Sequence, residues 1–114
     1  MEEPDEIRIQ KKQYGSGSSA QFERKLLKVM ERLGVKKYSF NWDRWSCWVE
    51  FVYKGETYRL DHSLEKARTM GIELSYGSDA FAEVVLTLED LARIFERGIY
   101  DLSTWVAGMK IEIS

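Results

Sequence analysis

Cys47 and His62 are the only cysteine and the only histidine of the chain, and together they could supply a nucleophile and a base. The strand pairing predicted below sets them opposite each other, with Asp61 directly before the histidine. A nucleophilic thiol needs a base within hydrogen-bond reach and a third group that orients the base. Asp61 faces the other side of the predicted sheet, and no glycine-rich turn follows Cys47. The pattern therefore favours a small buried cysteine over a catalytic one.

Residue spacing indicates no other catalytic or metal chemistry. One cysteine and one histidine cannot fill a structural zinc site, and the HExxH pattern is absent. The Gly-Ser-Gly at residues 15–17 lacks the GK[ST] sequence that completes a phosphate-binding loop. Glu83, Glu89, Asp90 and Glu96 fit the solvated side of an amphipathic helix. We therefore expect no catalytic residue, no metal and no cofactor, and predict that the protein is not an enzyme.

Basic side chains follow one side of the first predicted helix. The cluster comprises Arg24, Lys25, Lys28 and Arg32 on the helix, with Lys36 and Lys37 just beyond its end. Clusters of this kind neutralise the phosphates of nucleic acids. Residues 8–37 carry nine basic and two acidic side chains, whereas residues 38–114 carry eight and thirteen. This asymmetry indicates either a basic binding surface or the docking of one half of the chain on the other. A pI near 5.5 favours an ordinary solvated helix face over nucleic-acid binding.

Length and composition predict one folded domain. The chain has 114 residues, of which 44% are hydrophobic and 32% charged. Residues 1–18 look like a flexible lead-in because they end in a glycine- and serine-rich run. The domain would then span residues 19–114. A single cysteine, no apolar leader and no long apolar stretch favour the cytoplasm and argue against a membrane partner.

Three antiparallel strands are predicted after a first helix over residues 19–33. A turn at Lys54–Gly55 would pair Phe51 with Tyr58, Val49 with Leu60 and Glu50 with Arg59. A turn at Asp43–Arg44 would pair Trp42 with Trp45. The inner face would then collect the apolar side chains Tyr38, Phe40, Trp42, Trp45, Cys47, Val49, Phe51, Tyr58 and Leu60. Shifting the register by one residue would turn this whole set to water.

The outer face of this sheet carries charged residues around one tryptophan. Lys37, Glu50 and Arg59 would form a charge ladder across it, and Trp48 would lie near Ser39 and Asp61. A tryptophan exposed among charges is typical of interaction hot spots. The alternative is that a helix or another chain covers it. The contact surface that we predict is Trp48, Lys37, Glu50, Arg59 and Asp61.

The rest of the chain alternates helices with short strands. We expect a short helix capped by Ser63, a strand over residues 72–76, a long helix from Asp79 to Arg97, and a last short helix capped by Asp101. An edge strand would close the chain over residues 110–114. The predicted fold class is α+β, with the C-terminal helices packed on one face of the three-stranded meander.

Part of the chain resembles a known region of phage proteins. The stretches YKGETYRLDHSLEKA, YGSDAFAEVVLTLEDLARIFERGIYDL and TWVAGMK are similar to a region of phage- and prophage-borne proteins of Gram-positive bacteria. In those proteins the region lies ahead of a J-domain. The His-Pro-Asp hallmark of the J-domain is absent here, so no co-chaperone activity is implied. The resemblance covers about residues 53–110 and implies an accessory domain of a mobile element.

These patterns together predict a cytoplasmic, non-enzymatic α+β domain that binds another macromolecule. We expect a protein partner or self-association through the surface around Trp48, with no small-molecule ligand. The alternative is a nucleic-acid accessory protein that uses the basic first helix.

Overall fold

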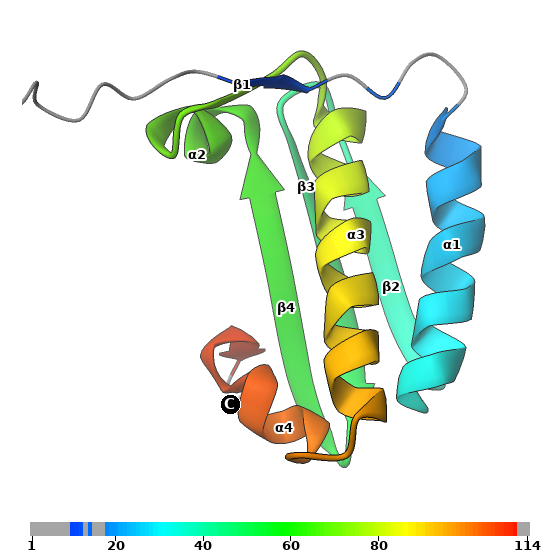
Figure 1. Ribbon diagram of the computed structural model, residues 1–114. Coiled ribbons are helices and arrows are strands. Elements are labelled where there is room, and N and C mark those ends of the chain that lie inside the picture. The colour runs from blue at the N-terminus through cyan, green and yellow to red at the C-terminus, as the bar shows by residue number, and fades with distance from the viewer. Residues whose placement is uncertain (1–9, 13, 15–17, 112–114) are drawn as a thin grey trace, which may run out of the picture.

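The computed structural model describes residues 10–12, 14 and 18–111. These residues form an α+β domain, as expected. Helices α1 (Ser18–Leu33) and α3 (Gly77–Glu96) lie side by side on one face of an antiparallel sheet (Figure 1). In the described part the sheet order is β2–β3–β4–β6, and its strands are β2 (Lys37–Trp42), β3 (Ser46–Tyr53), β4 (Glu56–Ser63) and β6 (Lys110–Ile111).

The core lies between the two long helices and the inner sheet face. From α1 it takes Leu26, Val29, Met30 and Leu33, the stripe that repeats at helical spacing. Gly34 ends this helix with a φ of 74°, a conformation that costs glycine little. From α3 the core takes two alanines, three branched aliphatic residues and one phenylalanine: Ala80, Phe81, Val84, Val85, Leu88 and Ala92.

The β3–β4 hairpin has the predicted register. Phe51 pairs with Tyr58, and Glu50 pairs with Arg59. Lys54 and Gly55 both have positive φ, at 50° and 79°, which is the turn geometry that matches the twist of two paired strands. Odd-numbered residues of β3 are buried and even-numbered ones are half-buried, so the predicted inner and outer faces are confirmed for residues 46–53.

The predicted register between β2 and β3 is wrong by two residues. Trp42 pairs with Cys47, not with Trp45, because four residues, 43–46, lie between the last paired residues of the two strands instead of two. The Asp43 carboxylate causes this: it accepts hydrogen bonds from the backbone N–H of Trp45 and of Ser46, both at 2.8 Å. A shift of two keeps every side chain of β2 on its predicted face. Trp45, however, leaves the inner face and lies in the loop.

The same shift breaks the predicted charge ladder. Lys37 pairs with Val52, and Ser39 takes the position opposite Glu50. Only the pair between Glu50 and Arg59 remains.

Helix α3 begins at Gly77, two residues before the predicted start. Asp79 is 5% exposed, and its carboxylate accepts from the N–H of Tyr76 at 2.9 Å and of Ser75 at 3.2 Å. It therefore satisfies backbone groups at the helix entrance from inside the first turn. Farther along, Phe81 stacks on Trp42 with ring centres 4.6 Å apart, which fixes α3 against β2.

The shorter elements lie at the two ends of the sheet. Helix α2 (Leu64–Thr69) is capped by Ser63, and α4 (Leu102–Trp105) by Asp101, both as predicted. Strand β5 (Ile72–Leu74) follows α2, and a 3₁₀ turn, η1 (Ala107–Met109), leads into β6. Strand β6 pairs with Thr57 and Tyr58 at the edge of the sheet. Residues 112–114 of the predicted edge strand lie outside the described residues.

Part of the segment expected to be a flexible lead-in is a strand. Within residues 1–18, β1 (Gln10–Lys12) pairs in parallel with β5, and the ring of Tyr14 packs edge-on against Phe22. The remaining lead-in residues before Ser18 are outside the described part of the chain.

Candidate interaction surfaces

Cys47 and His62 face each other across β3 and β4, as the strand pairing predicts. The Cys47 side chain is 2% exposed, and its burial raises the pKa of the thiol to about 12. Burial, reinforced by the charge of Lys66, lowers the pKa of His62. Asp61 belongs to the opposite face and pairs with Lys66 at 3.2 Å. At neutral pH this arrangement holds a neutral thiol beside a neutral imidazole, which suits packing rather than nucleophilic attack.

The described residues offer no metal centre. No group of three or more His, Cys, Asp or Glu side chains gathers closely enough among them to hold an ion. In the same part of the chain, no helix is long and apolar enough to cross a membrane.

Trp48 lies on the outer sheet face, between Asn41 and Asp61 on the neighbouring strands. It is half-buried rather than fully exposed, because the guanidinium of Arg59 lies over its ring at 4.7 Å. The same Arg59 forms an ion pair with Glu50 at 3.1 Å. The outer face therefore presents a tryptophan, an arginine stacked on it and a carboxylate held by that arginine.

No described helix covers this outer face. Helices α1 and α3 both lie on the other side of the sheet (Figure 1), and all four outward residues of β3 remain partly accessible. We define the outer-face patch as Trp48, Glu50, Arg59 and Asp61. Lys37, the fifth residue predicted for this surface, lies on the same face but is opposite Val52 on the edge strand.

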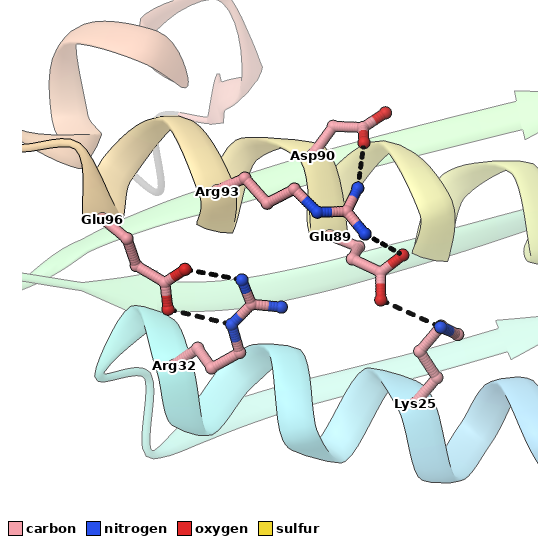
Figure 2. A network of polar contacts seen from close by, with 6 residues as sticks. All are labelled: Lys25, Arg32, Glu89, Asp90, Arg93 and Glu96. Carbon is pink, nitrogen blue, oxygen red and sulfur yellow. Dashed lines mark hydrogen bonds and ion pairs between the residues drawn. The ribbon is translucent and has the colours of Figure 1, made fainter.

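The basic first helix docks on α3 through ion pairs (Figure 2). Lys25 donates to the Glu89 carboxylate at 2.9 Å, and Arg32 donates to both oxygens of Glu96, at 2.9 and 2.6 Å. Arg93 of α3 also contacts Glu89, at 3.4 Å. The hydrogen bonds from these cations lower the pKa of Glu89 and of Glu96. The sequence left two explanations for its charge asymmetry, a basic binding surface or the docking of one half of the chain on the other. For Lys25 and Arg32 the docking of α1 on α3 is the explanation that holds.

The other basic candidates face solvent. Arg24, Lys28, Lys36 and Lys37 are exposed and have no ion-pair partner within the described ranges. An open hollow of about 430 Å³ lies beside Arg24 and Lys28 and is lined by Gln21, Arg24, Lys25, Lys28, Val29, Arg32 and Glu89.

Trp45 is a surface residue that the sequence pattern missed. Its side chain is 63% exposed, and the guanidinium of Arg44 lies 4.5 Å from the ring centre. The available signal was Asp43, because an aspartate at the end of a strand readily accepts from backbone N–H groups two and three residues on. The exposed aromatic pair Tyr100 and Trp105, at the other end of the sheet, was missed as well.

The fold and these surfaces define a small α+β domain whose sheet is covered by the two long helices on one face. The chain matches no protein-family model, no curated protein and no solved structure.

Proposed function

We propose that the protein is a non-enzymatic domain that binds another protein, or a second copy of itself, through the outer-face patch. The observation that carries this proposal is that the long helices cover only the inner face of the sheet. Trp48 on the outer face therefore remains partly accessible among charged neighbours. The resemblance to a prophage region supports a role as an accessory domain of a mobile element. One buried cysteine, Cys47, fits a reducing compartment such as the cytoplasm.

The chemistry of the patch supports a protein ligand. Tryptophan and arginine are the residue types most enriched at binding hot spots, and here Arg59 stacks on Trp48. Glu50 lies two residues along β3 from Trp48, and Asp61 lies opposite Trp48 on β4; they form ion pairs with Arg59 and Lys66, respectively. A partner that covers Trp48 would therefore meet an aromatic centre with a charged rim, the usual anatomy of a protein interface.

The surroundings of Cys47 support the non-enzymatic part of the proposal. Its thiol is protonated at neutral pH, and Asp61, the carboxylate next to His62 in the chain, lies on the opposite sheet face and pairs with Lys66.

The test compares capture of binding partners by wild type, Trp48→Ser and Trp105→Ser, alongside the oligomeric state of each. Trp105 is a matched control because it is another exposed tryptophan, on α4 rather than on the outer face. We expect Trp48→Ser to lose a partner, or a concentration-dependent dimer, that Trp105→Ser retains. If the two variants retain the same partners and the same mass as wild type, the outer face is not the contact surface.

A second candidate function is binding to nucleic acid through α1 and the residues after it. The observation that favours it is the set of exposed cations without ion pairs in the described chain, Arg24, Lys28, Lys36 and Lys37. Binding of this kind would weaken at least about tenfold between about 50 and about 200 mM salt. Lys28→Glu would weaken it further, whereas Glu31→Gln, on the same helix, would not. Binding that is insensitive to salt would exclude this candidate.

A further inference from the structure

The loop between β2 and β3 presents an aromatic stack at the α2 end of the sheet. The guanidinium of Arg44 lies 4.5 Å from the Trp45 ring centre and 4.8 Å from that of Tyr76. Tyr76 is 55% exposed and Trp45 is 63% exposed. The Arg44 guanidinium also donates to the carbonyl oxygen of Ser75 at 2.6 Å, so this hydrogen bond helps to hold it against the two rings. One face of the Trp45 indole is occupied by this arginine.

The backbone that carries Trp45 is held from several directions. Its N–H donates to the Asp43 carboxylate at 2.8 Å, and its carbonyl oxygen accepts from the N–H of Leu64 at 2.9 Å. The carbonyl of the preceding Arg44 accepts from the N–H of Gly77 at 2.9 Å. An exposed aromatic side chain on a fixed backbone loses little conformational freedom when it is covered. The loop therefore keeps the solvent-exposed Trp45 indole in a fixed position.

A hollow of about 340 Å³ lies beside this indole. It is lined by Trp45, Leu64, Glu65, Arg68, Glu73 and Leu74, and we call it the Trp45 pocket. Leu74 is buried and Leu64 is half-buried, so they form an apolar wall that an aliphatic chain could cover. The volume is at the lower end of ligand pockets, a size that suits one long side chain rather than a cofactor.

The charges around the Trp45 pocket favour a cation. Two carboxylates, Glu65 and Glu73, line it against one guanidinium, that of Arg68. Glu65 has no ion pair within the described ranges. Glu73 pairs with Lys11 at 3.9 Å, and the Lys11 side chain is 78% exposed, so water weakens that pair. Aromatic faces attract cations as well, and the Trp45 ring borders the hollow.

We propose that the Trp45 pocket binds a lysine or arginine side chain of a partner protein. The aliphatic stem lies along Leu64 and Leu74, while the cationic group lies against the Trp45 indole and between Glu65 and Glu73. Arg68 opposes this charge from the same wall, so its removal strengthens binding. The site is separate from the outer-face patch, and the two could engage different parts of one partner.

The test uses the full chain and a short peptide, acetyl-Gly-Gly-Arg-Gly-Gly-amide, with a norleucine peptide of the same length as the uncharged control. Binding is followed by NMR through the indole N–H of Trp45, assigned with Trp45→Phe. We expect the arginine peptide alone to shift this signal in a saturable way. Glu65→Gln and Glu73→Gln should each weaken binding about threefold, and Arg68→Gln should tighten it by a similar factor. Trp48→Ser should leave binding unchanged.

The sign of the Arg68→Gln effect separates this proposal from its main rival. If the pocket recognises anions, Arg68→Gln weakens binding and a short single-stranded oligonucleotide replaces the arginine peptide as the ligand that shifts Trp45. Equal binding of the norleucine peptide would mean that the pocket takes any apolar chain. Either result, or an unmoved Trp45 signal in folded wild type, overturns the proposal.

Discussion

A Cβ atom on Gly77 would lie 1.8 Å from the carbonyl oxygen of Asp43. The first turn of α3 thus packs directly on the loop that carries Trp45, backbone against backbone. The N–H of Gly77 also donates to the carbonyl of Arg44 at 2.9 Å. Only glycine leaves room for this approach, so Gly77 allows the N-terminus of α3 to pack directly on the β2–β3 loop.

We therefore predict that Gly77→Ala lowers the free energy of unfolding by about 2 kcal/mol or more, because either the loop or the helix must move. Gly108→Ala is the control, since a Cβ there would meet nothing within 4 Å. It should change stability by less than about 0.5 kcal/mol. Urea unfolding of both variants measures the difference. A Gly77→Ala variant as stable as Gly108→Ala would show that the two backbones are not in contact.

Asp79→Ala should destabilise the protein by about 1–2 kcal/mol, because the N–H groups of Ser75 and Tyr76 would lose their acceptor. Asp79→Asn retains an acceptor oxygen and should cost less. Asp90→Ala, on the exposed side of the same helix, is the control and should be nearly neutral. Thermal or urea unfolding gives the order of the three variants. An Asp79→Ala cost equal to that of Asp90→Ala would contradict the capping role.

The two β-hairpins show where sequence patterns determine register and where they do not. Lys54–Gly55 suits a two-residue turn, so the pairing of β3 with β4 followed from the turn and from the alternation together. Between β2 and β3 the alternation fixes only the face, because a shift of two residues leaves every side chain on the same side. The Asp43 carboxylate accepts three hydrogen bonds within the β2–β3 connection, and these stabilise the longer loop. Trp48 was therefore placed correctly and Trp45 was not.

The basic helix shows a different limit. Its amphipathic spacing predicted which side of α1 enters the core, and Leu26 and Met30 are buried accordingly. Spacing along one helix does not reveal which carboxylates of another helix lie opposite. The pairs of Lys25 with Glu89 and of Arg32 with Glu96 depend on how α1 and α3 pack, so the sequence left docking and nucleic-acid binding as alternatives.

The Lys25–Glu89 pair predicts a pH dependence of stability. The hydrogen bond from Lys25 lowers the folded-state pKa of Glu89 below its ordinary value of 4.5. The unfolded state therefore binds the proton first, so the stabilisation is present above about pH 4.5 and is lost as the pH falls through the folded pKa. The stability difference between wild type and Glu89→Gln should shrink as the pH is lowered past this value. Glu31→Gln, which alters an exposed carboxylate of α1, should show no such trend in the same unfolding series.

Cys47 gives the last prediction, on thiol reactivity. It lies in a central strand with Trp42 on one side and His62 on the other, and burial raises its pKa to about 12. Both the scarcity of thiolate and the lack of access should slow alkylation. We expect iodoacetamide at pH 8 to label the folded protein at least about a hundredfold more slowly than the protein in urea.

An exposed-cysteine control makes this comparison quantitative within one fold. The double variant Cys47→Ala with Ser39→Cys places the only thiol on the outward side of the edge strand β2, where residue 39 is exposed. This thiol should react at nearly the same rate in the folded and the unfolded protein. Equally rapid labelling of Cys47 in folded wild type would mean that the β3–β4 pair opens readily. The dismissal of Cys47 and His62 as a catalytic pair would then lose its physical basis, because accessibility is the property that a nucleophile needs first.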